Sequence, residues 1–389
     1  MVTQAILLKN PRMNRNQALR PPGNGVWDGR YSMLDAWRGL AALGVVVFHL
    51  DIGSQIRLGQ ASVLVFFVIS GYCITASAES CRRNRVGPSG YMWRRLRRIY
   101  PPYFFSLIYF LATRIWKLRS GMEDQVSHST VAWIQNLTLT QWLSLIWHPA
   151  AAPFNNPTLF IAGYWSLNYE EQFYIVIGVL LLTAAWLRKD LLPFVAALAV
   201  PAFIWNLLYP SICYGFFLEY WVPFALGSLV FYRLSRIADS RLRICIDAGI
   251  ICLLAFAIFK NHLRVPDSRS LYFEWIVVSG FSLLLLGLRR WDQALAASWL
   301  GRMLRTFGLT SYSLYLTQQC NLRASSMVAS RLIRWGVPAG FEFLIRLTFI
   351  CAIGAIFWYF CERPFLNKPL PARRDQDETE AASLTPARA

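Results

Sequence analysis

Long apolar blocks, separated by short polar and basic segments, dominate the pattern along the chain. The blocks are roughly 17–25 residues long, which is the length an α-helix needs to cross a bilayer core. We therefore predict an all-α fold, a polytopic membrane helix bundle with about ten transmembrane helices. The predicted spans are 33–52, 60–79, 99–117, 161–187, 191–209, 216–234, 244–260, 271–288, 307–330 and 342–362.

The basic residues between the blocks predict the orientation of this bundle. With the N-terminus in the cytoplasm, the cytoplasmic segments hold 27 of the 39 lysines and arginines, the opposite segments hold 11, and Arg38 lies within a span. Cytoplasmic loops of membrane proteins are enriched in Lys and Arg. The bias therefore favours an even number of spans with both termini in the cytoplasm.

Composition supports the membrane assignment and excludes other classes. The chain is 56% hydrophobic and only 15% charged, whereas soluble domains carry about 25% charged residues. The net charge of +18 does not indicate nucleic-acid binding, because the cations lie between apolar blocks. The eight cysteines are scattered, with no metal-ligand spacing and no disulfide framework. We expect no metal cofactor and no nucleic-acid partner.

The apolar pattern also divides the chain into parts. We predict a cytoplasmic N-terminal segment at 1–30, a transmembrane domain at 31–366, and a disordered cytoplasmic tail at 367–389. The segment 130–147 is aromatic and half apolar, so it could form an eleventh span. We favour a re-entrant or interfacial helix there, because three amides interrupt the apolar run: Gln135, Asn136 and Gln141.

The first apolar block, "LDAWRGLAALGVVVFHL" at 34–50, carries three ionisable residues on one helical face. Arg38 and His49 return to within about 20° of one another and lie roughly 16 Å apart along the axis, with Asp35 about 60° to the other side of Arg38. Ionisable residues within a span usually face the bundle interior or a water-filled cavity. Asp35 and Arg38 could instead form an anchoring ion pair, and His49 could be a core histidine.

A second charged pair lies within the fourth predicted span, "YWSLNYEEQFYIVIGVLLL" at 164–182. Glu170 and Glu171 reach a depth at which either could meet His49. A carboxylate beside a histidine orients the ring and strengthens it as a base. Neighbouring residues on a helix point about 100° apart, so only one glutamate can face a given partner. The alternative is a structural hydrogen-bond network with Arg38 or another helix.

Seven arginines cluster in 82–98, beside the cytoplasmic end of the third span. They could bind a phosphorylated ligand, because the guanidinium group matches phosphate geometry. They could equally reflect orientation and contact with anionic membrane lipid. The sharper candidates for a ligand site lie just before Pro101 and Pro102, and are Arg94, Arg95, Arg97 and Arg98.

The ninth predicted span is dense in hydroxyl and amide side chains, in the stretch "GLTSYSLYLTQQCNLR" at 308–323. Such a helix either lines a cavity or packs through interhelical hydrogen bonds. Tyr312 and Gln318 are its candidate substrate-binding residues.

Six motifs, in order along the chain, resemble those of the acyltransferase-3 membrane family. Each is weak alone, but the ordered set, over roughly 31–366, is specific. The motifs are the Arg38–His49 spacing, "FFVISGYCI" (66–74), "RRLRRIYPPY" (94–103), "YWSLNYEEQFY" (164–174), "GLTSYSLYLTQ" (308–318) and "CERPF" (361–365).

The resemblance implies a ten-helix enzyme of the bacterial inner membrane that moves an acyl group, commonly acetyl, from cytoplasmic acyl-CoA onto a hydroxyl. The implied acceptors are surface or exported glycans and lipid-linked saccharides, or small molecules such as macrolides. It also implies that Arg38 and His49 are the essential pair, with Glu170 or Glu171 and Arg94–Arg98 assisting.

Two departures from the family pattern affect this expectation. Many members carry a histidine near position 318, where this chain has Thr317, Gln318 and Gln319, so a second histidine is not expected at the site. Larger members carry an esterase-like C-terminal domain. This chain ends about 20 residues after its last motif, so a relay through such a domain would need a separate protein.

The mechanism that we expect has acyl-CoA at the cytoplasmic end, its phosphates held by Arg94–Arg98, with Arg38 as a further candidate. His49 then acts as the general base for the acceptor hydroxyl, or carries the acyl group covalently. Two other classes remain open. One is a transporter or flippase for a lipid-linked sugar, and the other is a non-catalytic membrane partner of a polysaccharide synthase.

Overall fold

The computed structural model describes residues 31–51, 57–121, 129–263 and 270–366 of the 389-residue chain. The predicted segments 1–30 and 367–389 lie outside these residues. Within the described ranges the all-α prediction is confirmed, since β-structure is limited to one antiparallel bridge between Ala150 and Cys213.

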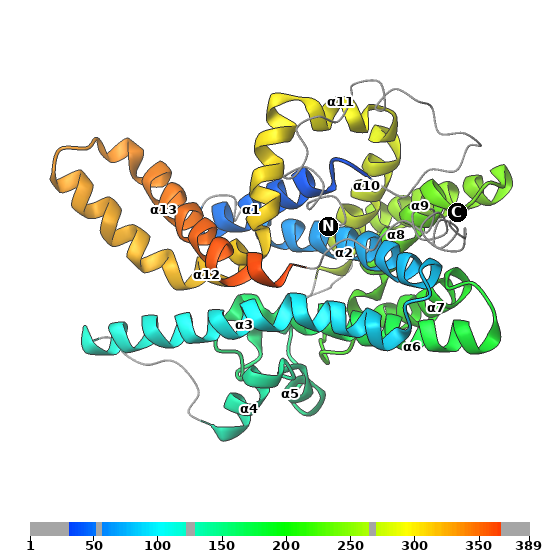
Figure 1. Cartoon of the computed structure of the whole chain (residues 1–389), viewed down its shortest axis with the longest axis horizontal. Coiled ribbons are helices and arrows are strands. Elements are labelled where there is room, and N and C mark those ends of the chain that lie inside the picture. Colours follow the sequence, from blue (N-terminus) through cyan, green and yellow to red (C-terminus); the bar gives the residue numbers. More distant parts are fainter. Residues whose placement is uncertain (1–30, 52–56, 122–128, 264–269, 367–389) are drawn as a thin grey trace, which may run out of the picture.

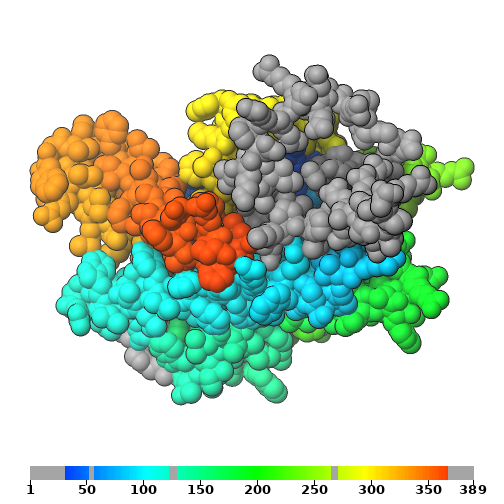
Figure 2. Space-filling view, in the orientation of Figure 1, coloured from blue at the N-terminus to red at the C-terminus, as the bar shows by residue number. Residues whose placement is uncertain are grey.

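Each predicted span coincides with a helix. In chain order these helices are α1 (Leu34–His49), α2 (Leu58–Arg83), α3 (Pro88–Arg119), α6 (Trp165–Leu187), α7 (Leu192–Leu208), α8 (Leu218–Ser235), α9 (Ser240–His262), α10 (Leu271–Leu288), α12 (Trp299–Arg334) and α13 (Glu342–Phe357). Short helices α4 (Thr130–Thr138), α5 (Trp142–Trp147) and α11 (Asp292–Ala297) connect them. The hairpin of α12 and α13 extends beyond the rest of the bundle, at the left in Figure 1, and stands out as the orange lobe above α3 in Figure 2.

Five helical segments of the described chain are long and apolar enough to cross a membrane: Leu58–Arg83, Ala162–Leu187, Ser240–His262, Leu271–Ala297 and Ala339–Phe365. The protein is therefore an integral membrane protein. Two of the remaining helices that match predicted spans are short, since α1 has 16 residues and α7 has 17. A helix of 16 residues is about 24 Å long, less than the ~30 Å core. Helices α3 and α12 are longer but carry several arginines.

Glycines let two pairs of these helices approach closely. A Cβ at Gly308 of α12 would lie 1.7 Å from the carbonyl oxygen of Asp35 in α1, and one at Gly71 of α2 would lie 2.0 Å from the carbonyl oxygen of Phe224 in α8. No other residue fits there without moving the backbones apart. Small residues serve this purpose in membrane bundles, where van der Waals packing drives association. The contact with α12 fixes the depth of α1 in the bundle.

The start of α1 is held by a buried carboxylate from the α10–α12 connection. Asp292 accepts hydrogen bonds from the backbone N–H groups of Ser32, at 2.8 Å, and Met33, at 2.9 Å. These N–H groups precede the first helical turn, where a negative charge also complements the helix dipole. The residues that follow, including Arg38, are therefore anchored at one end of the bundle.

The segment 130–147 folds as two short helices, because the chain turns at Leu139 with a φ of 56°. Helix α4, with nine residues, is only about 14 Å long, so the segment is not an eleventh continuous span. The interrupting amides bond to each other: Gln141 donates to Asn136 at 3.0 Å. Asn136, which is fully buried, also donates to the carbonyl oxygens of Ala132 and Thr158.

Candidate active site

Arg38 lines a small cavity inside the bundle, which we call the Arg38 cavity. It has a volume of about 50 Å³. Its polar walls come from four helices: Arg38 of α1, Ser70 of α2, Ser166 and Glu170 of α6, and Ser311, Tyr312 and Tyr315 of α12. Val63, Phe66, Phe67 and Leu167 complete it.

Arg38 makes no hydrogen bond or ion pair with any described residue, including Asp35. The anchoring Asp35–Arg38 pair is therefore not formed. Glu170, on the same cavity, accepts hydrogen bonds from Tyr174 at 2.6 Å and Ser70 at 3.3 Å. A guanidinium that has no hydrogen bond or ion pair to the described residues of a bundle is costly, so it favours a ligand that carries negative charge.

A buried glutamate that the sequence did not single out lies beside this cavity. Glu362, in the π-helical turn Trp358–Glu362, accepts hydrogen bonds from the backbone N–H of Ser313 at 3.1 Å and from its hydroxyl at 2.6 Å. Its carboxyl group interacts electrostatically with Arg98 and Arg38. Arg98 and Arg38 also interact with one another, so two guanidinium groups and two carboxylates, Glu362 and Glu170, gather at one end of α1.

His49, at the other end of α1, is held by an amide whose own orientation is fixed. The backbone N–H of Gly163 donates to Gln319 Oε1 at 3.0 Å. This leaves Gln319 Nε2 facing His49 Nε2, at 3.1 Å. An amide nitrogen can only donate, so His49 Nε2 is the acceptor in this contact. The ring nitrogen thus presents a lone pair, the form that a base or a nucleophile requires.

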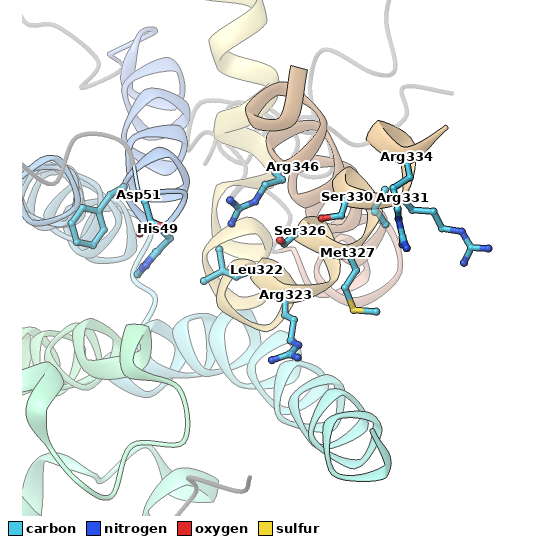
Figure 3. Close-up of a pocket in the computed structure, with 12 residues that line it drawn as sticks. His49, Asp51, Leu322, Arg323, Ser326, Met327, Ser330, Arg331, Arg334 and Arg346 are labelled. Atoms are coloured by element: carbon cyan, nitrogen blue, oxygen red, sulfur yellow. The ribbon is translucent and has the colours of Figure 1, made fainter. Parts of the chain in front are cut away.

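His49 also borders a second, larger space of about 1120 Å³, which we call the His49 pocket. Its walls are the end of α1 and the hairpin of α12 and α13. Figure 3 shows His49 and Asp51 on one side and the arginines of the hairpin on the other. These are Arg323, Arg331, Arg334 and Arg346.

Neither glutamate of the fourth predicted span hydrogen-bonds to His49, contrary to expectation. Glu170 bonds to Ser70 and Tyr174, and Glu171 accepts a hydrogen bond from Tyr100 of α3. The two carboxylates lie on different faces of α6, as the 100° rotation between neighbours requires. The residue that orients His49 is Gln319.

Comparison with known families now decides the class of protein. Residues 31–363 match the family model described as an acyltransferase domain, which is most of the chain. The chain belongs to the acyltransferase-3 family. The resemblance seen in the motifs is confirmed.

Curated relatives of this acyltransferase are distant. The O-acetyltransferase OatA of Staphylococcus aureus (strain NCTC 8325 / PS 47) is 24% identical over 373 residues, covering 87% of this chain and 58% of OatA. A second protein of S. aureus, SACOL0978 of strain COL, is 32% identical over 156 residues, covering 39% of this chain and 24% of that protein. This chain thus spans little more than half the length of OatA. No solved structure matches it.

The arginines of the third motif of this acyltransferase do not form one cluster. Arg95 is buried, with its guanidinium over the rings of Tyr91, at 5.6 Å, and Tyr174, at 5.4 Å. Arg97 is exposed, and Arg98 is half-buried near Arg38. Successive positions on a helix point in different directions. Arg95 therefore supports the bundle, while Arg98 and Arg97 remain available to a ligand, and Arg94, also half-buried, has other interactions.

The side chains of α12 that reach the Arg38 cavity and His49 lie on one face of the helix. Tyr312 and Tyr315 line the Arg38 cavity, and Gln319 meets His49 one turn farther along. Gln318, predicted to bind substrate, is instead buried away from this face, and its Oε1 has no partner in the described residues. Spacings of three and four residues keep Tyr312, Tyr315 and Gln319 on one face, a signal that the sequence already contained.

The described residues contain no group of three or more His, Cys, Asp or Glu side chains that could hold a metal ion. The chemistry derived below rests on the histidine, the arginines and the hydroxyl and amide groups around them.

Proposed function

We propose that the protein is an O-acetyltransferase of the bacterial inner membrane, which moves an acetyl group from cytoplasmic acetyl-CoA to a hydroxyl of an exported glycan or lipid-linked saccharide. One observation carries this proposal. A single helix, α1, presents an unpartnered arginine to one cavity and a lone-pair nitrogen of histidine to another.

The orientation of the two cavities follows from the basic residues. We propose ten spans, with both termini in the cytoplasm, because the segments then assigned to that side hold most of the lysines and arginines. The Arg38 cavity then lies toward the cytoplasm and the His49 pocket toward the opposite face. Roughly 16 Å along α1 separates the two residues, about half of the bilayer core.

The donor binds at the cytoplasmic end in this proposal. Arg38 and Arg98 are close enough to repel each other, and neither has a hydrogen-bonded partner among the described residues. Phosphate groups relieve such repulsion, because guanidinium binds them with paired hydrogen bonds. The phosphates of acetyl-CoA fit this position, with the exposed Arg97 nearby. The thioester then extends toward Tyr315 and Gln319.

At the other end, His49 Nε2 takes the proton of the acceptor hydroxyl. The hydroxyl oxygen forms a bond to the acetyl carbonyl carbon, the carbon–sulfur bond breaks, and the thiol of CoA leaves with the proton from His49. The acceptor hydroxyl takes the place of Gln319 at Nε2, after the amide has held the ring in this orientation. General-base assistance contributes about 10²–10⁴-fold, and positioning of the two substrates supplies much of the remainder. An acetyl-histidine intermediate would use the same nitrogen.

Mass spectrometry of surface glycans tests the proposal. Cells that produce the protein should carry glycans heavier by one acetyl group, about 42 Da, and cells that produce His49→Ala at equal membrane abundance should not. Equal acetylation in both would refute the assignment of His49. Movement of a lipid-linked sugar across the membrane without acetylation, and without a need for acetyl-CoA, would instead identify a transporter.

A further inference from the structure

The charge of the residues that line the His49 pocket indicates which kind of acceptor it binds. Its lining includes four arginines and one carboxylate, Asp51. Arg323 and Arg334 have no hydrogen bond or ion pair with any described residue. Arg346 reaches Glu342 at 3.7 Å, but its Nε is buried without a partner. The pocket is therefore strongly positive beside the proposed catalytic histidine.

The arginines of α12 form a stripe that leads away from His49. Arg323 lies one turn beyond Gln319, and Arg331 and Arg334 follow on the same side of the pocket (Figure 3). From Arg323 to Arg334 the helix rises about 16 Å. Ser326 and Ser330 lie between them and offer hydroxyl groups. A ligand that meets the whole stripe is elongated, with more than one negative group.

We propose that the acceptor is an anionic glycan, a saccharide chain that carries carboxylate or phosphate groups and lies along this stripe with one hydroxyl at His49. The proposal rests on the proposed function, whose acceptor it makes specific. Arg323 and Arg346, which flank the histidine, hold the nearest negative group. Arg331 and Arg334 hold the groups farther along the chain. A small neutral acceptor would leave these charges unused.

Binding to the purified full chain in nanodiscs of phosphatidylcholine tests this without relying on acetyl transfer. The probes are tetragalacturonate, which carries four carboxylates, and maltotetraose, a neutral chain of equal length. We expect tetragalacturonate to bind at least about tenfold more tightly, because its carboxylates accept charge-assisted hydrogen bonds from the arginines. The preference should shrink as salt screens the charges. Equal affinity for the two probes would overturn the proposal.

Substitutions assign the preference to the pocket. Arg323→Gln and Arg346→Gln should each weaken tetragalacturonate binding about tenfold and leave maltotetraose binding unchanged. Arg119→Gln, at the exposed end of α3 and outside the pocket, is the matched control and should retain wild-type affinity. The salt dependence of the unmodified protein provides a measurement that does not depend on the folding of any variant.

Two further outcomes separate this inference from the proposed function and from binding of membrane phospholipid. His49→Ala should still bind tetragalacturonate. If the unmodified protein bound tetragalacturonate but transferred no acetyl group in any assay, the proposed function would be refuted and the anionic site would stand. The arginines could also contact phospholipid headgroups. If dihexanoyl phosphatidylglycerol binds in an Arg323-dependent manner and tetragalacturonate does not, the stripe is a lipid contact and the proposal is wrong.

Discussion

The two cavities on α1 differ in size, in access and in the charged residues that line them. The Arg38 cavity is small, about 50 Å³, and combines one arginine with Glu170, serines and tyrosines from four helices. The His49 pocket is about 1120 Å³, and arginines of one helical hairpin dominate its charge. A narrow site that contains an arginine suits the donor, whose phosphates we place at Arg38 and Arg98. A wide, positive groove suits a large and variable acceptor.

In the proposed function, this difference lets one short helix serve two substrates. Helix α1 is shorter than a bilayer core and is locked against α12 by Gly308. Its two functional residues therefore stay at fixed depths, while α12 supplies Tyr315 to one cavity and Gln319 to the histidine of the other. The boundary between the cavities is thus made of side chains from α1 and α12.

Replacing His49 should have the largest effect on this arrangement. His49→Ala removes the base, and we expect transfer to fall about 10²–10⁴-fold while the protein still inserts and binds acetyl-CoA. The measurement is incorporation of labelled acetyl groups into the glycan fraction. His148→Ala changes an exposed histidine that lines neither cavity and should retain full activity. Equal loss in both variants would contradict the assignment.

Replacing Arg38 should affect the donor end alone. Arg38→Gln removes a charged partner of the donor, worth about 1.5–3 kcal/mol, so we expect kcat/KM for acetyl-CoA to fall about 10–100-fold. Affinity for the anionic acceptor should not change, because Arg38 does not line the His49 pocket. Arg188→Gln, at an exposed arginine outside both cavities, is the control. A loss of acceptor affinity would show that the two cavities are not separate sites.

Replacing Gln319 should produce a smaller loss. Gln319→Met removes one neutral hydrogen bond to His49, worth about 0.5–1.5 kcal/mol, so we expect kcat to fall about 2–10-fold with the KM for acetyl-CoA unchanged. Kinetics across acetyl-CoA concentrations separate the two parameters. A change in KM alone would mean that Gln319 serves the donor rather than the histidine.

The two neighbouring glutamates offer the finest comparison. Glu170 lines the Arg38 cavity and Glu171 bonds to Tyr100. Glu170→Gln should reduce transfer about tenfold, because it removes the carboxylate that lines the donor cavity and accepts hydrogen bonds from Ser70 and Tyr174. Glu171→Gln should remain within about twofold of the unmodified protein. The reverse order would mean that α6 presents its other face to the substrate.

The sequence predicted the helices and the shared face of Arg38 and His49, because hydrophobic length and helical periodicity are local properties. It could not predict which glutamate, if any, meets His49, because that depends on the rotation of α6 relative to α1. It placed Gln318 at the site although the spacing of Tyr312, Tyr315 and Gln319 favoured the neighbouring amide. Glu362 lay in a recognised motif, but its contact with Ser313 joins residues that are 49 positions apart in the sequence.

The segment at 130–147 also shows that the sequence does not reveal tertiary contacts. Its amides correctly argued against a continuous span, because such groups need partners. Those partners proved to be one another, the backbone of the segment itself and groups outside it, such as the carbonyl oxygen of Thr158. Composition identified the polar groups, and only the fold identified their hydrogen bonds.

The most direct test of the central claim, that one histidine joins a cytoplasmic donor to an acceptor on the opposite face, is transfer across a sealed membrane. Labelled acetyl-CoA is enclosed in vesicles that contain the protein in one orientation, and tetragalacturonate is added outside. We predict labelled acetyl esters outside and free CoA inside, with neither in His49→Ala vesicles. Transfer that occurs only when donor and acceptor share one compartment would contradict the account.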